Sequence, residues 1–235
     1  MARLSCLFLS ILLISCATAP IQKQTLVPGL EIYEIKTMSE VEKWVIPGTL
    51  VLFDLDSTVF EVQDLVGHAN FYHDMTTKYP RQQTKILHKM WAAIKTSDVK
   101  LVEAITPKLI QSMQDRGVAV MALTSRDLSL VKATLRQVKS VGVDFSKTSP
   151  THKSKYFHDG ILFADKNYPK GKALLAYLKS TGFDAKRIIL VDDLEKNLVS
   201  VCADTGAIGL YYPLVDNKRH LEWDEQEAER RFNED

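Results

Sequence analysis

Short apolar runs alternate along this chain with longer segments of helical periodicity. The runs are Thr49–Phe53, Val118–Leu123, Ile188–Val191 and Ile208–Tyr212. Uninterrupted apolar runs of this length indicate strands that are buried on both faces of a sheet. Such strands separated by helices predict an α/β fold, a Rossmann-like three-layer sandwich in which helices cover both faces of a parallel sheet.

Helical segments are expected between these runs. Residues 60–116 carry apolar side chains at helical spacing, and Leu128–Val138 has the same pattern. Near the start of the chain, Ser39 and Glu42 have the spacing of a capping box, which predicts a short helix through Trp44.

The remaining segments set the expected domain boundaries. Residues 31–220 form the predicted core domain, and a spacer at 16–30 precedes it. Within the core, an insertion at 152–165 carries Asp159-Gly160 between aromatic flanks, which is typical of a hairpin turn, and this hairpin is expected to be solvated. The tail at 221–235 is charged on all sides, so we predict a solvated helix or a frayed end there.

The N-terminal segment predicts an export signal. Arg3 is the only charged residue in Met1–Pro20, and Leu7–Ile14 is an apolar stretch too short to span a membrane. The alternative is a buried helix of the mature fold, which the polar segment that follows disfavours. No later apolar run is long enough to cross a bilayer.

Two processing routes remain open for this signal. Ala17-Thr18-Ala19 fits the small-x-small cleavage rule, but cleavage there would leave Pro20 as a poorly tolerated first residue. Leu13–Cys16 resembles a bacterial lipobox, in which the cysteine is lipidated and becomes the first residue. We favour the lipoprotein route, in which residues 1–15 are removed and lipidated Cys16 contacts the membrane. The chain is then exported and lipid-anchored, facing the periplasm or outer membrane, and otherwise periplasmic or secreted.

Composition and charge exclude some partners and sites. The 235 residues include 30 basic and 29 acidic side chains, so a nucleic-acid binder that relies on bulk positive charge is disfavoured. The cysteines are Cys6, Cys16 and Cys202, with no CxxC pair, which excludes a zinc ribbon or a thioredoxin-type site. Lipidation of Cys16 would leave Cys202 alone, so the mature chain would form no internal disulfide.

Polar residues follow three of the predicted strands. The clusters are Asp54–Thr58, Thr124–Arg126 and Asp192-Asp193. The carboxyl ends of strands in an open parallel sheet meet at the ligand-binding edge, so these clusters should converge. Several carboxylates at one edge repel each other, and a bound cation offsets that repulsion. Oxygen ligands of this kind favour Mg²⁺.

Four motifs in order resemble those of the haloacid dehalogenase superfamily, in its phosphatase branch, over about Thr49 to Tyr212. The motifs are Asp54-Leu55-Asp56-Ser57-Thr58, then Thr124, then a lysine that opens a helix in Pro169-Lys170-Gly171-Lys172-Ala173-Leu174, and then Asp192-Asp193 followed by Asn197. The resemblance implies a core of the predicted α/β type with a small helical cap inserted near 60–115. It also implies a lysine- and Mg²⁺-assisted reaction on phosphate esters.

The resemblance assigns the two aspartates of the first motif to catalysis. Asp54 would attack phosphorus and form an aspartyl-phosphate, and its alternative role is to cap the turn after the strand. Asp56 would protonate the leaving oxygen and then activate water, and its main-chain carbonyl would face the metal. Dehalogenases lack this second aspartate.

The second motif implies phosphate binding. Thr124 would hold a phosphoryl oxygen, with the Ser125 amide beside it. The alternative for Thr124 is to cap the helix that begins at Leu128. Arg126 is expected either to contact substrate or to form a surface ion pair.

The active-site lysine is open between Lys166, Lys170 and Lys172. Lys170 fits the family pattern best, because it would open a helix and could neutralise both Asp54 and the phosphoryl group.

The last motif implies the metal ligands. Asp193 would be a direct Mg²⁺ ligand, and Asp192 would lie behind it or contact the lysine. Asn197 would orient the loop. The expected metal set is therefore Asp54, Asp56, Asp193 and Asp192.

The predicted cap also contains His68, His73 and His88. Their spacing does not match a zinc motif, so structural roles are favoured. Because the cap is short, the site is expected to be fairly open.

These observations predict a Mg²⁺-dependent phosphomonoester hydrolase that acts on a small phosphorylated metabolite. One alternative is a phosphotransferase or mutase on the same scaffold. A second is a non-catalytic surface lipoprotein that binds a partner through the cap. The sequence predicts neither the particular substrate nor the oligomeric state.

Overall fold

The computed structural model describes residues 25–151, 153–165, 168–215 and 223–234. At its centre is a seven-stranded sheet in the order β1-β9-β8-β2-β5-β7-β6, in which every neighbouring pair is parallel except β6 and β7. The strands are β1 Ile32–Glu34, β2 Thr49–Phe53, β5 Ala119–Thr124, β6 Phe157–His158, β7 Ile161–Phe163, β8 Arg187–Asp192 and β9 Ile208–Tyr211.

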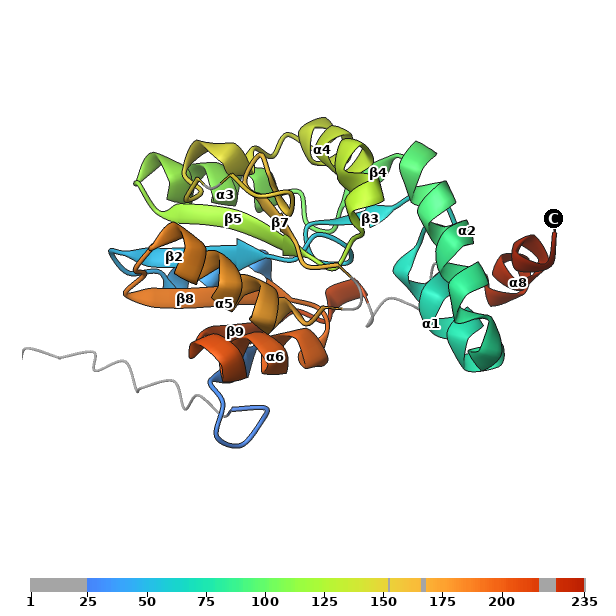
Figure 1. Ribbon diagram of the computed structural model, residues 1–235, viewed down its shortest axis with the longest axis horizontal. Helices are drawn as coiled ribbons and strands as arrows, with labels where there is room; N and C mark the ends of the chain where they lie inside the picture. Colours follow the sequence, from blue (N-terminus) through green and yellow to red (C-terminus); the bar gives the residue numbers. More distant parts are fainter. Residues whose placement is uncertain (1–24, 152, 166–167, 216–222, 235) are drawn as a thin grey trace, which may run out of the picture.

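Helices cover both faces of this sheet (Figure 1). One face carries α3 (Thr106–Asp115) and α4 (Val131–Ser140), and the other carries α5 (Lys170–Thr181) and α6 (Glu195–Thr205). Successive side chains of β2 point to opposite faces, so alternate residues of the strand belong to two separate hydrophobic clusters. The α/β three-layer fold predicted from the apolar runs is confirmed. None of the described helices combines the length and the hydropathy that crossing a membrane requires.

The short helix before β2 begins earlier than predicted. It is a 3₁₀ helix, Met38–Trp44, and Glu40 rather than Glu42 reaches back to its start. The Oε1 atom of Glu40 accepts hydrogen bonds from the backbone N–H groups of Lys36 at 2.9 Å and Thr37 at 3.3 Å. Thr37, not Ser39, is therefore the capping residue.

The hairpin within 152–165 forms around the predicted turn, but it is solvated only in part, because β6 is half-buried and β7 is fully buried. Asp159 and Gly160 both have positive φ, 46° and 78°, as a tight two-residue turn between β6 and β7 requires. A Cβ atom on Gly160 would lie 2.2 Å from the carbonyl oxygen of Phe145, so only glycine fits there. Strand β7 is fully buried because it pairs with β5 and extends the central sheet.

The segment after β2 forms a cap that is helical only in its middle. It contains β3 (Phe60–Val62), α1 (Ala69–Lys78), a 3₁₀ turn (Pro80–Gln82), α2 (Gln83–Thr96) and β4 (Val99–Leu101). The prediction of helix throughout 60–116 is wrong at β3 and β4, which pair antiparallel and form the ribbon that joins the cap to the core (Figure 1). Strands of three residues are too short to show a period of their own.

The charged tail is part of the cap and not a solvated extension. Helix α8 (Glu225–Asn233) lies beside the cap helices (Figure 1), and Ala228 and Phe232 are fully buried against Phe71 and Met75. Its apolar face consists of two side chains one helical turn apart. Such a narrow stripe gives little periodicity in a charged sequence.

We expect Phe232→Ala to destabilise the cap by about 3 kcal/mol, because the change removes a buried ring from a small cluster. Hydrogen exchange should speed up in α8 and α1 and stay unchanged in β2 and β8. Arg230→Ala is the matched control, because Arg230 is exposed and pairs with Glu227 and Glu234 of the same tail. Equal exchange in the two variants would contradict the docking of α8.

Candidate active site

The register of the central strands brings the polar clusters to one edge of the sheet. Phe53 at the end of β2 lies opposite Val191 of β8 on one side and Ala122 of β5 on the other. The backbone N–H of Asp54 then donates to the carbonyl oxygen of Val191 at 2.9 Å. After β2, the next strands of the sheet, β5 and β7, lie on one side of β2, and the later strands β8 and β9 lie on its other side. The site therefore lies at the switch point of the sheet, where parallel α/β sheets bind ligands.

A tight turn follows β2 and carries Asp56. Ser57 adopts a left-handed φ of 61°, and its N–H donates to the carbonyl oxygen of Phe60 at 2.9 Å. The N–H groups of Val59 and Phe60 both donate to the carbonyl oxygen of Leu55, at 2.9 and 3.1 Å. A left-handed serine costs about 1 kcal/mol, so the surrounding bonds must hold the turn in place. The turn keeps Asp56 close to the strand end.

Lys170 lies between two carboxylates at this edge. It is the first residue of α5 and 2% exposed, and its Nζ is 2.6 Å from Oδ1 of Asp54 and 2.7 Å from Oδ2 of Asp192. Burial alone would lower the pKa of Lys170, but the charges of Asp192 and Asp54 outweigh it and raise the pKa above its ordinary value. Lys170 is therefore an ammonium ion at neutral pH.

The other candidate lysines are placed differently. Lys172 is exposed and pairs with Asp204 at 2.6 Å, and Lys166 lies outside the described residues. The start of α5 can approach α6 closely because residue 171 is glycine, where a Cβ atom would lie 2.1 Å from the carbonyl oxygen of Ser200. This close packing fixes Lys170 at the site.

Asp54 is a buried carboxyl group in a crowded electrostatic environment. Burial raises its pKa, and the charge of Lys170 opposes that effect. The neighbouring carboxylates of Asp192 and Asp56 add to the rise, so that the pKa of Asp54 is about 7. Without further positive charge, the site therefore holds Asp54 partly protonated near neutral pH.

Asp192 is fixed by bonds to both of its oxygens. Oδ1 accepts from the N–H of Leu194 and from Nδ2 of Asn197, each at 2.9 Å, and Oδ2 pairs with Lys170. Asn197 therefore orients the acidic loop, as the sequence predicts. These bonds give Asp192 the role of holding the lysine.

Three of the aspartates could share a cation. Asp54, Asp192 and Asp193 are buried, and one oxygen from each lies within 4.8 Å of the others. Lys170 pairs with only two of these carboxylates, so the three aspartates outnumber the ammonium charge. A divalent cation would balance the remaining charge, and hard oxygen donors suit Mg²⁺. The donor set therefore fits the expected metal.

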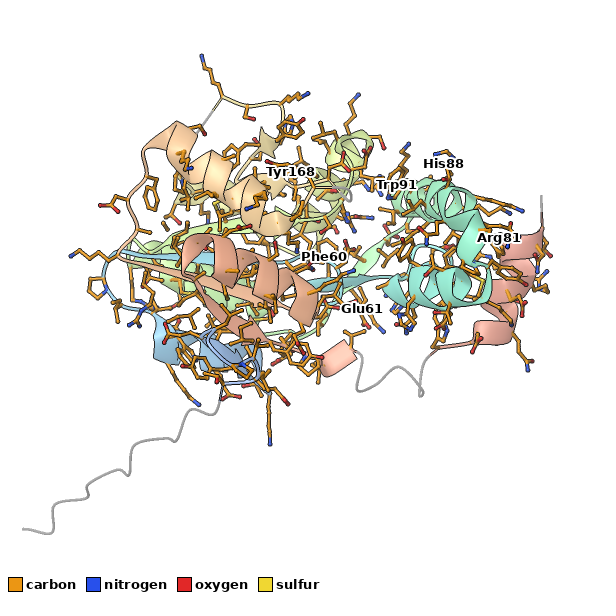
Figure 2. All side chains as sticks on the ribbon, turned by 60° about the horizontal axis from the view of Figure 1, so that its bottom comes forward. Phe60, Glu61, Arg81, His88, Trp91 and Tyr168 are labelled. Atoms are coloured by element: carbon orange, nitrogen blue, oxygen red, sulfur yellow. The ribbon has the colours of Figure 1, made fainter. Side chains whose placement is uncertain are left out.

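The histidines of the cap do not join a metal-binding group among the described residues. His68 caps α1, where its Nδ1 accepts from the N–H of Asn70 at 3.2 Å. Figure 2 shows His88 out on the cap, whereas Phe60 and Glu61 lie where the cap joins the core.

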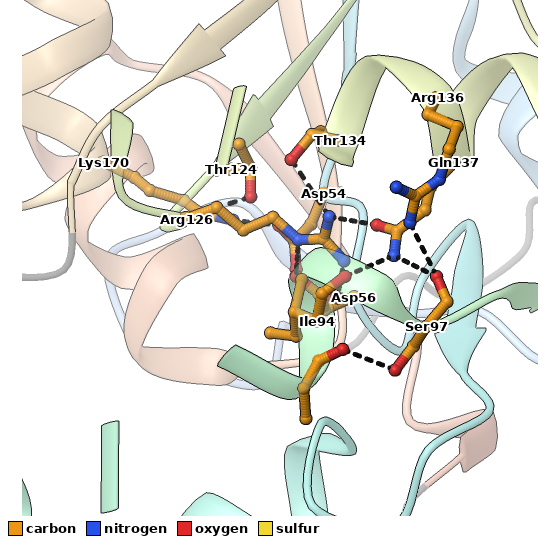
Figure 3. Close-up of polar contacts among 11 residues, drawn as sticks. Asp54, Asp56, Ile94, Ser97, Thr124, Arg126, Thr134, Arg136, Gln137 and Lys170 are labelled. Atoms are coloured by element: carbon orange, nitrogen blue, oxygen red, sulfur yellow. Dashed lines mark hydrogen bonds and ion pairs between the residues drawn. The ribbon is translucent and has the colours of Figure 1, made fainter. Parts of the chain in front are cut away.

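The carboxylate of Asp56 faces an arginine rather than the other aspartates. Its Oδ2 accepts from Nε of Arg126 at 2.8 Å, and its Oδ1 accepts from Nη2 at 2.7 Å (Figure 3). Arg126 is 4% exposed, so this is not the surface pair that was one of its two expected roles. The side chain of Asp56 is also not part of the metal-binding group. The expected metal contact of Asp56 is its main-chain carbonyl, which stays a prediction.

The second motif places Thr124 at the end of β5. Thr124 is 1% exposed, and its Oγ1 accepts from the N–H of Arg126 at 3.2 Å. The alternative role of Thr124 as a helix cap is wrong, because Asp127 caps the following 3₁₀ helix, Leu128–Leu130, through a 2.7 Å bond from Ser129. Ser125 is exposed at the rim of this edge.

Two polar residues of α4 complete the surroundings of Arg126, and the sequence reasoning missed both. Nη1 of Arg126 donates to Oγ1 of Thr134 at 3.0 Å and to Oε1 of Gln137 at 2.6 Å. Thr134 and Gln137 are three residues apart on the buried face of α4, beside Ala133 and Val138. Polar residues at helical spacing within an apolar stripe are the signal that could have found them.

The chain resembles several known proteins. A Chlamydia muridarum (strain MoPn / Nigg) protein named "Putative outer membrane protein" is 22% identical over 184 residues, which cover 72% of this chain and 70% of that protein. A haloacid dehalogenase-like hydrolase from Streptococcus pneumoniae matches with 14% identity and a TM-score of 0.47, over 80% of this chain and 91% of that one. A class C acid phosphatase from Bacillus anthracis with tungstate bound matches with 15% identity and a TM-score of 0.39, over 84% of each chain.

One family model covers most of the sheet and of the cap and every strand end of the site. It is described as "Protein of unknown function (DUF2608)" and matches residues 34–231, so the chain belongs to this family.

Proposed function

We propose that the protein is a Mg²⁺-dependent phosphomonoester hydrolase of the haloacid dehalogenase type, with Asp54 as its nucleophile. The observation that carries this proposal is the pair of short contacts from buried Lys170 to Asp54 and Asp192, next to Asp193. An ion pair buried this deeply is costly to build. A site that binds and transfers an anionic group needs such a buried positive charge, which gives a reason for this ion pair.

Asp54 and Asp56 divide the chemistry between them. Lys170 occupies Oδ1 of Asp54, and we assign the attack on phosphorus to Oδ2. The new bond from Oδ2 to phosphorus forms as the bond to the leaving oxygen breaks, and Asp56 gives that oxygen its proton. In the second half, Asp56 takes a proton from water, the water oxygen bonds to phosphorus, and the Asp54–phosphorus bond breaks.

Charge at the site favours an anionic substrate. Asp193, Asp54 and the main-chain carbonyl of Asp56 would hold Mg²⁺, with Asp192 behind them. Bound Mg²⁺ supplies the positive charge that offsets repulsion between a carboxylate and a phosphate. Lys170, which contacts Asp54 and Asp192, would add to this positive charge. The hydroxyl of Thr124 and the N–H of Ser125 would donate to the phosphoryl oxygens.

Hydrolysis of p-nitrophenyl phosphate by the purified mature chain tests the proposal. We expect turnover with Mg²⁺, its loss with EDTA, and a phosphate adduct on Asp54 in quenched samples. A chain that binds no Mg²⁺ and forms no adduct would leave only the non-catalytic binding protein. Rates that rise with added alcohol acceptors would favour the phosphotransferase, and a panel of small phosphorylated metabolites would identify the substrate class.

Binding of Mg²⁺ should depend on pH. Since the pKa of Asp54 is about 7 and a metal ligand must be deprotonated, Mg²⁺ binding should release a proton near neutral pH. We expect the dissociation constant to fall roughly tenfold between pH 6 and pH 8, with about fivefold of that fall below pH 7, and to change little above pH 8. Calorimetry in buffers of different ionisation enthalpy measures the released proton, and a pH-independent affinity would contradict the raised pKa.

We also propose that the protein is exported and anchored through lipidated Cys16. The lipobox-like Leu13–Cys16 supports this proposal, and residues 1–24 lie outside the described part of the structure. The name of the Chlamydia muridarum relative is compatible with export. Labelling with radioactive palmitate, lost in Cys16→Ser, distinguishes a lipoprotein from a simply cleaved one.

A further inference from the structure

Arg126 has protein partners for four of its five N–H groups. Its Nε and Nη2 donate to the two oxygens of Asp56, its Nη1 donates to Thr134 and Gln137, and its guanidinium lies over the ring of Phe60, 5.2 Å from the centroid. Every nitrogen of the guanidinium is therefore engaged, in a position that is 4% exposed. These bonds use four of the five N–H donors of the guanidinium, so Arg126 is held mainly by protein groups and is directed at Asp56.

The two hydrogen bonds from Arg126 leave Asp56 able to exchange protons. A carboxylate has about four lone-pair sites, and the two bonds from Arg126 use one on each oxygen. The side chain of Asp56 remains 26% exposed, whereas that of Arg126 is 3% exposed. Arg126 therefore fixes the rotation of the carboxylate while part of that carboxylate stays accessible to solvent.

Gln137 connects this pair to the end of the cap. Its Oε1 accepts from Arg126, and its Nε2 donates to the carbonyl oxygens of Ile94 at 3.0 Å and Ser97 at 2.9 Å (Figure 3). Ile94 belongs to the last turn of α2, and Ser97 follows that helix just before β4 returns the chain to the core. Gln137 is 1% exposed, and its amide is satisfied at both ends.

A second residue holds the same end of the cap without touching the pair. The guanidinium of Arg136 donates to the carbonyl oxygen of Ser97 at 3.0 Å (Figure 3) and to that of Lys95 at 3.0 Å. Two neighbouring residues of α4 therefore both anchor α2, and one of them, Gln137, also reaches Arg126. This difference allows anchoring of the cap to be separated from positioning of Asp56.

We propose that Arg126 is the positioning residue for the acid/base Asp56, and that Gln137 links that position to the cap at the end of α2. This inference rests on the proposed function for the role of Asp56. A general acid/base must lie within hydrogen-bond distance of the proton it moves, and a displacement of about 1 Å costs on the order of 100-fold in rate. A shift of α2 would move Gln137, then Arg126, and then the carboxylate.

Substrates with different leaving groups separate positioning from phosphate binding. Release of 2,4-dinitrophenolate needs no acid, whereas release of glycerol from β-glycerophosphate does. For Arg126→Met we expect kcat on β-glycerophosphate to fall about 100-fold. With 2,4-dinitrophenyl phosphate, the initial burst of 2,4-dinitrophenolate release should keep its rate within threefold of wild type. Steady-state turnover should slow and phosphoenzyme should accumulate, because Asp56 is still needed to activate water. The inhibition constant of inorganic phosphate should stay within twofold.

Three further variants complete the set. Arg126→Lys keeps the positive charge but cannot donate two parallel hydrogen bonds to the carboxylate. Its kcat on β-glycerophosphate should therefore be less than tenfold higher than that of Arg126→Met. Gln137→Met should show the same pattern as Arg126→Met with about a tenfold effect. Arg136→Met is the matched control and should stay within twofold of wild type.

Hydrogen exchange provides a readout that does not need activity. Exchange across the turn at residues 55–60 should be faster in Arg126→Met and Gln137→Met than in wild type, and unchanged in Arg136→Met. If the wild-type chain neither hydrolyses the esters nor forms phosphoenzyme, the proposed function is wrong, and this exchange pattern alone decides whether Asp56 is held as we infer.

The opposite results would overturn the inference. Weaker phosphate inhibition with equal losses on both esters would make Arg126 a phosphate-binding residue. Unchanged kinetics and exchange in folded Arg126→Met would show that Asp56 needs no positioning. If Arg126→Met does not fold, wild-type kinetics in both Arg126→Lys and Gln137→Met would also overturn the inference that Arg126 positions Asp56.

Discussion

Asp54→Asn is expected to abolish turnover without disturbing the fold. Asparagine has nearly the same shape as aspartate, but its amide does not attack phosphorus, so kcat should fall on the order of 10⁴-fold or more, and no phosphoenzyme should form. The fold should survive because Lys170 keeps its 2.7 Å pair with Asp192. Quenched-flow labelling together with urea unfolding measures both effects.

The stability of this variant carries separate information. Because burial raises the pKa of Asp54, the ionised carboxylate is unfavourable in the folded chain, and this cost appears as the pH rises from about 4 to above 7. The neutral amide removes the cost, so metal-free Asp54→Asn should be at least as stable as wild type at pH 8. Asp184→Asn, on the exposed surface, serves as control. Activity above a tenth of wild type in Asp54→Asn would remove Asp54 from the mechanism.

The strands that carry the site were predictable because they are buried on both faces. A central strand such as β2, with all five residues buried, reads as an uninterrupted apolar run. The edge strand β1 has three residues, of which only Ile32 is buried, so it carries no such signal. Strand β7 has an apolar run as short as that of a solvated hairpin, and only its pairing with β5 distinguishes the two.

The meeting of Asp54 with Asp192 was predictable for the same reason. Both residues follow buried parallel strands, and the carboxyl ends of such strands share one edge. The choice of Lys170 came from the resemblance, whose motif has a lysine at the start of a helix, and the contacts of Lys170 in the structure are consistent with that choice.

The pairing of Asp56 with Arg126 was not predictable from local pattern. The two residues are 70 positions apart, and their contact depends on how α4 packs beside the turn after β2. The sequence gives no measure of that packing, so the same arginine looked like a substrate contact or a surface residue. In the same way, the docking of α8 rests on contacts about 150 residues apart, such as the one between Tyr79 and Glu229.

Lys170→Met should be the most destabilising single change at the site. The methionine removes the one positive charge between Asp54 and Asp192, and breaking a buried ion pair by removing one partner costs about 3–5 kcal/mol. The raised pKa of Lys170 means that titration of the lysine itself removes none of this stabilisation until the pH rises above about 10. At pH 8 the variant should therefore show the whole deficit.

The pH and metal dependence of this deficit identify its cause. Without the ammonium group, the carboxylates can avoid repulsion only by taking up a proton, so the deficit should shrink at pH 5.5 and grow toward pH 8. Mg²⁺ should restore part of the lost stability at pH 8, because it replaces some of the missing positive charge. Lys172→Met is the matched control, since its exposed pair with Asp204 should contribute less than about 1 kcal/mol. Urea unfolding at both pH values, with and without Mg²⁺, measures these differences. Equal stability of the two lysine variants at pH 8 would mean that the carboxylates at the strand ends do not depend on Lys170, and the electrostatic basis of the proposed site would be wrong.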